Sequence, residues 1–226
     1  ASAANFWASR AYLACGRPEV STPRLRAAAS HVEGFYGLLA QRALGLPVMQ
    51  DWQKLGYIRA DWNTLATRAG ALRASALMEI GQIGLADREL RHLAAISMST
   101  DYEPILRLAA RINLPATQYW LAHHPPRGAE APMSARYPAP EWTPARGWRV
   151  ENALVFAHAL QESRFITDAV SRAGARGVMQ LMPETAARLQ RALPFEEGRA
   201  LNDPSFNIEL GQAYLEQLRD SGATQG

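Results

Sequence analysis

The chain has 226 residues, which is enough for one large domain or two modest ones. Hydrophobic residues make up 48% and charged residues 20%, so neither a disordered nor a collagen-like chain fits. The net charge is +3, and the 24 lysines and arginines are dispersed among acidic residues. A nucleic-acid-binding protein would cluster them, so we expect no nucleic-acid partner. No apolar stretch approaches the roughly 20 residues of a membrane span, so no transmembrane segment is expected either.

The sequence also gives no sign of a metal or cofactor site. Cys15 is the only cysteine, which excludes an internal disulfide and a thiolate cluster. His123 and His124 are adjacent and precede two prolines, a pattern that indicates the exit of a helix and not ligands at helical spacing. We therefore expect neither a metal nor a cofactor.

Residues 1–122 predict one helix after another. The segments "FWASRAYLACGRP" and "RLRAAASHVEGFYGLLAQRALGLP" supply an initial pair. Over 63–81, apolar residues recur at spacings of three and four and predict a single helix with one apolar stripe, formed by Leu65, Ala69, Leu72, Ala76 and Ile80. Helical patterns follow over 85–97 and 101–115, the latter with Asp101 as N-cap. Short breaks between such helices predict stacked antiparallel pairs, an α-solenoid.

The composition changes over residues 123–148. This segment contains six prolines and three Trp or Tyr residues and has no helical period, which is typical of a connection packed on something else. Helical patterns return over 150–163, 183–193 and 205–219. We therefore predict an all-α protein with three parts: a helical superhelix or linker domain at 1–126, a Pro/Trp-rich connection at 127–149 and a second helical domain at 150–226.

Glu162 stands at the end of an apolar helical run, "VFAHALQESRF". Val155, Ala159 and Glu162 follow helical spacing, so the carboxyl group shares a face with apolar residues. Loss of hydration there would raise its pKa, which suits a general acid. Position alone favours another interpretation, a glutamate that caps the helix or pairs with Arg164 or Arg172.

The segment "SRAGARGVMQLMPETAARL" (171–189) changes that balance. A glycine-rich loop leads to Met179, Gln180 and Met182, and Pro183 then opens a helix. Methionines suit an irregular apolar groove, although core packing is the simpler interpretation of each one. Gln180 offers an amide that could bind a ligand or satisfy buried backbone groups.

Three ordered blocks now resemble one known family. Glu162-Ser163, then Gly177-to-Pro183, then "LNDPSFNIELGQAYLEQL" at 201–218 are similar in order and spacing to soluble lytic transglycosylases. These bacterial enzymes have a goose-lysozyme-like catalytic domain. The resemblance implies a periplasmic enzyme that cleaves the bond between N-acetylmuramic acid and N-acetylglucosamine in the glycan strands of peptidoglycan and leaves a 1,6-anhydro end.

The resemblance also assigns roles to residues. Glu162 would act first as acid and then as base, with the muramyl N-acetyl group stabilising the developing charge. Ser163, Ser171, Gln180 and Met182 would line the sugar and acetamido subsites. The family's Ala-Tyr-Asn-Ala-Gly block does not appear before the final "RDSGATQG". We therefore expect the chain to be an incomplete portion of a longer protein with a truncated lysozyme-like domain.

Two alternatives remain open at this point. A goose-type lysozyme of the same fold would hydrolyse the bond, with water as the attacking group and a second carboxylate to position it. A helical scaffold would bind peptidoglycan or a protein partner without cleaving anything. No sequence feature names a protein partner.

Overall fold

The computed structural model describes residues 1–48, 55–192 and 200–222. Within these ranges the regular structure is helical, and only two isolated antiparallel bridges occur, which pair Val170 with Arg176 and Arg176 with Leu181. The all-α prediction is therefore confirmed. The chain divides into two compact units, residues 1–53 and 54–226. The predicted three-part division at 126 and 149 stays a prediction.

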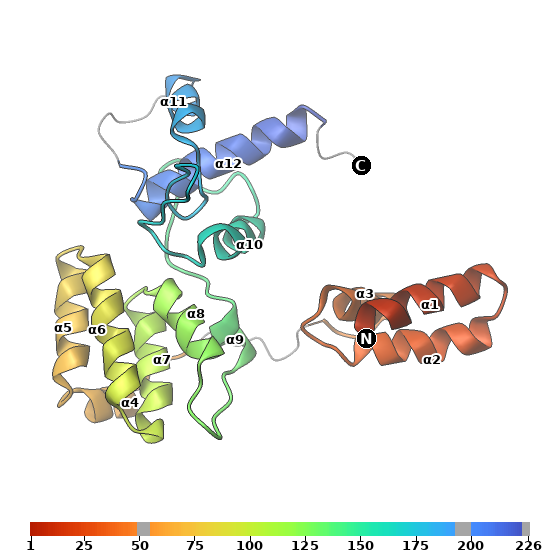
Figure 1. The fold of residues 1–226 in the computed structure, drawn as a ribbon, viewed down its shortest axis with the longest axis horizontal. Helices are drawn as coiled ribbons and strands as arrows, with labels where there is room; N and C mark the ends of the chain where they lie inside the picture. The colour runs from red at the N-terminus through yellow and green to blue at the C-terminus, as the bar shows by residue number, and fades with distance from the viewer. Residues whose placement is uncertain (49–54, 193–199, 223–226) are drawn as a thin grey trace. The chain divides into compact units, whose positions relative to one another are not determined.

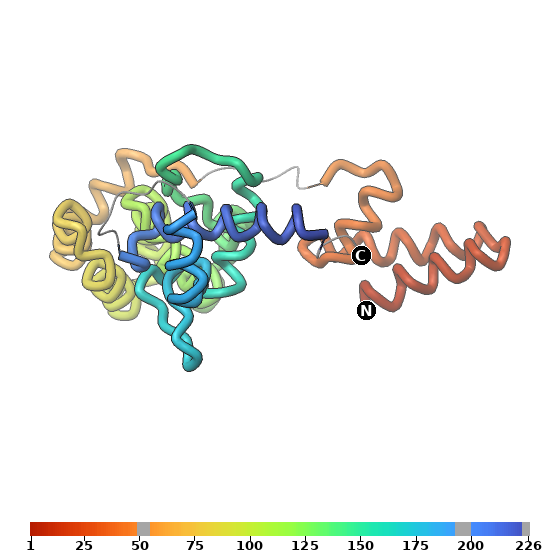
Figure 2. Tube along the Cα trace, turned by 90° about the horizontal axis from the view of Figure 1, so that it is seen from above, coloured from red at the N-terminus to blue at the C-terminus, as the bar shows by residue number. Residues whose placement is uncertain are grey.

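The first unit is a small helical group. It contains α1 (Ser2–Ala14), α2 (Pro18–Ala29) and α3 (Phe35–Ala43), and α1 lies beside α2 in both views (Figures 1 and 2). Its buried core consists of Ala28, Ala29 and Ala40, against which Phe6, Leu25 and Leu44 pack. The predicted segment from 24 to 47 is broken between α2 and α3. Gly37 explains the close approach there, because a Cβ atom would lie 1.8 Å from the His31 carbonyl oxygen.

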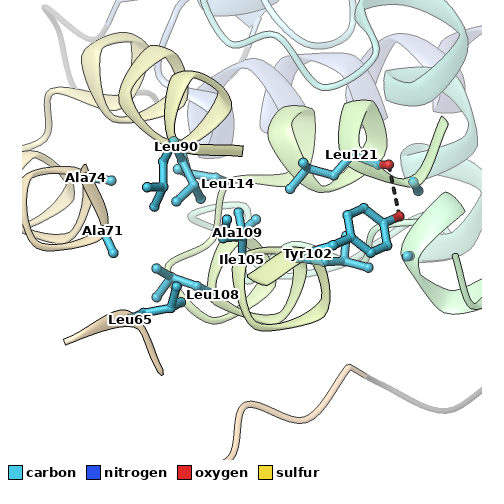
Figure 3. Close-up of a cluster of buried hydrophobic side chains, with 14 of the residues drawn as sticks. Leu65, Ala71, Ala74, Leu90, Tyr102, Ile105, Leu108, Ala109, Leu114 and Leu121 are labelled. Carbon is cyan, nitrogen blue, oxygen red and sulfur yellow. Dashed lines mark hydrogen bonds between the residues drawn. The ribbon is translucent and has the colours of Figure 1, made fainter. Parts of the chain in front are cut away.

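The second unit begins with an array of short helices. These are α4 (Arg59–Leu65), α5 (Ala69–Glu79), α6 (Ile83–Ile96), the 3₁₀ turn η1 (Ser99–Asp101), α7 (Tyr102–Arg111), α8 (Pro115–His123) and α9 (Met133–Arg136). Leucines, isoleucines and alanines from α4 to α8 form one core cluster (Figure 3). At its edge, the buried Tyr102 hydroxyl donates to the Leu121 carbonyl over 3.0 Å.

The prediction of one helix over 63–81 is wrong. The chain breaks at residues 66–68, between α4 and α5. Arg68 there reaches Asp101, 33 residues away, with 2.7 Å between guanidinium nitrogen and carboxylate oxygen. Asp101 does occupy the N-cap position of α7, but it makes no side-chain cap bond to the helix. No local sequence pattern predicts an ion pair between residues that lie this far apart in the chain.

The predicted apolar stripe of α5 also faces the wrong way. Leu72 and Ile80 are exposed, and the buried face consists of Gly70, Ala71 and Ala74. Small residues let α5 approach α6 closely, since a Cβ on Gly70 would lie only 3.2 Å from the Leu93 Cβ. Close packing against α6 therefore buries the face of α5 with small side chains and leaves the face with larger apolar side chains exposed.

The rest of the second unit contains three further helices around a second core cluster. These are α10 (Asn152–Ser163), α11 (Pro183–Ala192) and α12 (Pro204–Asp220) (Figure 1). Each agrees within two residues with a predicted helix. Proline opens α11 and α12, and the Asp203 side chain caps α12 by accepting from the Phe206 backbone N–H over 2.8 Å. Among the described residues, no helix combines the length and apolar character that a membrane crossing requires.

Candidate active site

Glu162 lies in the last turn of α10. Val155 and Ala159 are fully buried, whereas the Glu162 side chain is exposed. The buried face of the chain continues instead through Ser163 and Phe165, which are 7% and 2% exposed. The expectation that apolar neighbours desolvate Glu162 is therefore wrong for the described chain, because the helix ends before the core covers this position.

The structural alternative for Glu162, an ion pair with a nearby arginine, is not what forms. Among the residues that the structure describes, Glu162 pairs with neither Arg164 nor Arg172. A carboxylate without a local cation is available to another partner. This leaves Glu162 free to meet a ligand from solvent.

The backbone turns sharply just after Glu162. Arg164 and Phe165 both adopt left-handed conformations, with φ of 51° and 63°. Such backbone is costly for residues other than glycine and persists where the surroundings impose it. Here the Phe165 ring is buried, with its centroid 6.1 Å from that of Trp142 and 6.5 Å from that of Phe156. Aromatic packing therefore fixes the end of the helix that presents Glu162.

Ser163 links this helix to the next predicted block. Its buried hydroxyl lies 3.0 Å from the Ala159 carbonyl oxygen and 2.9 Å from that of Val178. A side chain used in this way holds the loop after Gly177 against α10. Ser163 thus lies behind Glu162, within the protein, and not on an open surface.

The loop that contains Gln180 is closed by backbone hydrogen bonds. Arg176 and Leu181 exchange N–H···O bonds of 2.9 and 3.0 Å, and the Gly177 N–H donates to the Ala169 carbonyl over 3.0 Å. Gln180 itself is left-handed, with φ of 47°, and half-buried. Its Nε2 donates to the carbonyls of Ala169 and Gly177 over 3.2 and 2.9 Å. The amide nitrogen of Gln180 therefore stabilises the loop by these two hydrogen bonds. Its amide oxygen accepts no hydrogen bond among the described residues.

The remaining predicted residues have different environments. Met182 is 41% exposed, whereas Met179 is only 8% exposed. Met179 packs on Gly211 of α12, where a Cβ would lie 2.8 Å from its Cγ, which confirms the core interpretation for this methionine. Ser171 is half-buried, and its Oγ accepts from the Ala175 N–H over 3.0 Å, which closes a tight turn.

Sequence reasoning missed Asn207, which is completely buried on α12. Its Oδ1 accepts from the Met179 N–H over 2.8 Å, and its Nδ2 donates to the carbonyls of Arg176 and Leu201 over 3.1 and 3.0 Å. A polar residue inside an apolar helix pattern is the signal that could have identified it.

Sequence reasoning also missed a buried charge cluster on the same helix. Glu209 is 0% exposed and pairs with Arg149 over 2.7 Å and with Arg146 over 3.1 Å. The amide of Gln212 bonds the backbone at Gly147 and Arg149 over 2.9 and 3.1 Å. Together with Trp142 and Trp148, which pack in the second core cluster, these bonds fasten the end of the Pro/Trp-rich connection to α12.

The two histidines considered as ligands end a helix instead. Each Nδ1 lies 2.8 Å from a backbone carbonyl oxygen one turn earlier, that of Tyr119 for His123 and that of Trp120 for His124. Helix α8 ends at His123, as the sequence predicted. In the described part of the chain, no group of three or more His, Cys, Asp or Glu side chains could hold a metal ion.

Comparisons with known proteins agree with the family resemblance of the three sequence blocks between residues 162 and 218. Residues 143–224 match the family model of the transglycosylase SLT domain. Over 80 residues the chain is 38% identical to the membrane-bound lytic murein transglycosylase C of Haemophilus ducreyi and 39% identical to that of Actinobacillus pleuropneumoniae. Each match covers 34% of this chain and 22% of the relative, so the chain spans less than a quarter of the length of these relatives.

Solved structures extend the similarity to the whole fold. The chain resembles the lytic transglycosylase Slt of Pseudomonas aeruginosa, solved as an inactive mutant with a glutamate replaced by glutamine, with a TM-score of 0.71 and 26% identity over 98% of this chain and 37% of that one. The 70 kDa soluble lytic transglycosylase of Escherichia coli gives a TM-score of 0.75 at 20% identity, covering 98% of this chain and 36% of that one. The lysozyme-like helical fold predicted from the sequence is therefore confirmed.

Proposed function

We propose that the protein is a lytic transglycosylase that cleaves peptidoglycan, because residues 143–224 match the family model of the transglycosylase SLT domain. The observation that carries this proposal is the placement of Glu162, an exposed carboxylate without an ion-pair partner among described residues, at a helix end held by buried packing. The names of its relatives support the same activity. Peptidoglycan lies outside the cytoplasmic membrane, so we place this activity in the periplasm.

The proposed reaction uses one carboxyl group twice. Glu162 donates its proton to the glycosidic oxygen as the bond from muramyl C1 to that oxygen breaks, and the N-acetyl group of the substrate stabilises the positive charge at C1. The Glu162 carboxylate then removes the proton of the C6 hydroxyl, whose oxygen closes onto C1. The products are a free 4-hydroxyl and a 1,6-anhydro ring, and no water is consumed.

A single carboxylate is the feature that separates this reaction from ordinary glycoside hydrolysis, which uses a pair. Asp168 and Glu184 are the next two acids after Glu162 in the sequence. The Asp168 carboxylate lies beside α6, since a Cβ on Gly84 would be 3.8 Å from its Oδ2. Glu184 belongs to the first turn of α11. The Pseudomonas relative is inactive with one glutamate replaced by glutamine, so that relative needs a glutamate, which supports an essential role for Glu162 here.

The other site residues remain proposals with distinct roles. Gln180 offers its side-chain oxygen and Met182 its exposed thioether to a sugar or acetamido group, and Ser171 shapes the neighbouring turn. For Ser163, the buried hydroxyl bonds favour support of the loop over direct contact with a sugar. These roles follow from which polar atoms already form hydrogen bonds within the protein.

The test is Glu162→Gln in the full-length natural protein, assayed on purified peptidoglycan. We expect activity to fall by about 10²–10⁴-fold, because glutamine cannot transfer a proton. Glu184→Gln is the matched control and should keep full activity, since Glu184 is exposed and belongs to α11. Mass spectrometry should find products lighter by one water than hydrolytic ones.

Each alternative predicts a different result. A goose-type hydrolase would release products with free reducing ends and the mass of added water. A non-catalytic scaffold would bind peptidoglycan and release nothing. Full cleavage by the Glu162→Gln protein would refute the proposed mechanism.

A further inference from the structure

We propose that Asn207 is a positioning residue, which holds the backbone of residues 176–179, and with it the following Gln180, in place beside the helix that carries Glu162. This inference rests on the proposed function, because it concerns the same site. It adds a residue that lies on α12 and whose side chain cannot reach solvent.

The hydrogen bonds of Asn207 all go to the two loops that precede α12. Its oxygen accepts from the Met179 N–H, and its nitrogen donates to the carbonyls of Arg176 and Leu201, with distances of 2.8, 3.1 and 3.0 Å. Both amide hydrogens are therefore in use, and the side chain is 0% exposed. Only a neutral amide supplies one acceptor and two donors in this arrangement.

Gly177 makes the contact possible. It is left-handed, with φ of 77°, and a Cβ there would lie 2.2 Å from the Asn207 Nδ2 and 2.3 Å from the Leu201 carbonyl oxygen. The loop backbone thus rests directly on the Asn207 amide. Such close approach gives the loop little freedom to shift while the amide stays in place.

The same strip of backbone is tied to the helix of Glu162 from its other side. The Val178 carbonyl accepts from the Ser163 hydroxyl over 2.9 Å, and the next residue, Met179, donates to Asn207. Ser163 follows Glu162 directly, and Gln180 follows Met179. Two buried side chains, one from α10 and one from α12, therefore hold the carbonyl and the N–H of the same peptide group, the one between Val178 and Met179, which lies one residue before Gln180.

Asn207→Asp tests this arrangement with the smallest change of shape. The carboxylate still accepts from Met179 but faces the carbonyls of Arg176 and Leu201 without a proton to donate, so it repels them and moves the loop. Misplacement by about 1 Å can reduce turnover by about 10²-fold, and we expect a loss of that order. At lower pH the acid gains a proton that it can donate, so the activity ratio of variant to wild type should rise.

Gln212→Glu is the matched control. Gln212 is on the same helix, is equally buried and also bonds two backbone groups, but those belong to the connection at Gly147 and Arg149. Both proteins are assayed in full-length form, well below their unfolding midpoints measured by circular dichroism. We expect the control to lose stability yet to keep turnover within about threefold of wild type, without the change of ratio at low pH.

Three results would overturn the inference: wild-type turnover in Asn207→Asp, an equal loss in folded Gln212→Glu, or a variant-to-wild-type ratio that does not change with pH. If Asn207→Asp does not fold, Asn207→Ser replaces it, with a smaller loss of turnover expected. Glu162→Gln, run in parallel, separates the two proposals. An active Glu162→Gln protein refutes the proposed mechanism, whereas an inactive one beside a fully active Asn207 variant refutes only the positioning role.

Discussion

Glu209 is a carboxylate enclosed in protein, and its environment decides its charge. Burial alone would raise the pKa of the Glu209 carboxyl group. Hydrogen bonds from the Arg146 backbone and from the Arg149 and Arg146 side chains outweigh burial, so the pKa lies below its ordinary value of 4.5. The charged form is therefore the one that the fold stabilises.

This direction fixes how stability depends on pH. Since the folded pKa is below the unfolded one, the contribution of Glu209 is complete above about pH 4.5 and is lost as pH falls through the folded value. Glu209→Gln should lower the free energy of unfolding by about 3 kcal/mol at pH 7, because two arginines lose their buried partner. The difference from wild type should shrink towards pH 3.

Denaturant unfolding at several pH values measures this difference. Glu216→Gln is the control, since the Glu216 side chain is 26% exposed and, in the described part of the chain, pairs with Arg149 alone, over 3.0 Å. It should cost less than about 1 kcal/mol. A Glu209→Gln deficit that is the same at pH 3 and pH 7 would contradict the assigned direction of the pKa shift.

Single residues also show what sequence reasoning could reach. Glu162 and Gln180 could be predicted as site residues because they belong to motifs with a characteristic spacing, and their roles stay predictions. Asn207 and Glu209 were missed because their side-chain partners, apart from Leu201, lie 28 or more residues away along the chain. Buried polar groups follow no local period, and only the folded contacts of α12 show which segments they hold.

At the scale of elements, the end of α10 combines two left-handed residues. Arg164 is at the C-cap with φ of 51°, where glycine is favoured because it has no Cβ. Arg164→Gly should raise the free energy of unfolding by about 0.5–1 kcal/mol, after the added flexibility of the unfolded chain is subtracted.

Thermal and denaturant unfolding test this prediction, with Arg172→Gly as control. Arg172 is an equally exposed arginine, but its φ is not positive. The same change of charge should therefore destabilise the protein there by about 0.4–1 kcal/mol. If both variants lost stability to the same extent, relief of backbone strain at Arg164 would be disproved.

Helices were predicted well where their ends carry local signals. Pro183 and Pro204 mark the starts of α11 and α12, and the predicted ranges differ from these helices by at most one residue at each end. The prediction of one helix over 63–81 was wrong because the break at residues 66–68 depends on the ion pair between Arg68 and the distant Asp101. The prediction of the buried face of α5 was wrong because close packing of small residues, such as Gly70 on Leu93, decides which side is buried.

At the scale of the whole molecule, the second unit joins two core clusters. Ala116 of α8 packs against the cluster that contains Trp142 and Phe165. A cavity of about 40 Å³ lies at this junction, lined by residues of α6 and α8, by Trp142 and by residues 165–168. The helical array therefore contacts the turn that follows Glu162.

The two compact units differ in how much apolar surface they bury, and this predicts a difference in local stability. Among the described residues, the buried core cluster of the first unit consists of alanines, whereas the second unit buries leucine, isoleucine, phenylalanine and tryptophan in two clusters. Regions with few buried apolar contacts open more readily. In hydrogen–deuterium exchange of the 226-residue chain, we expect amides of α1 and α2 to exchange on the order of tenfold or more faster than those of α7 and α12. To control for fraying of helix ends, the comparison uses only amides in the middle of each helix. Equal protection of α1 and α7 would mean that the small core of the first unit is not what limits its stability.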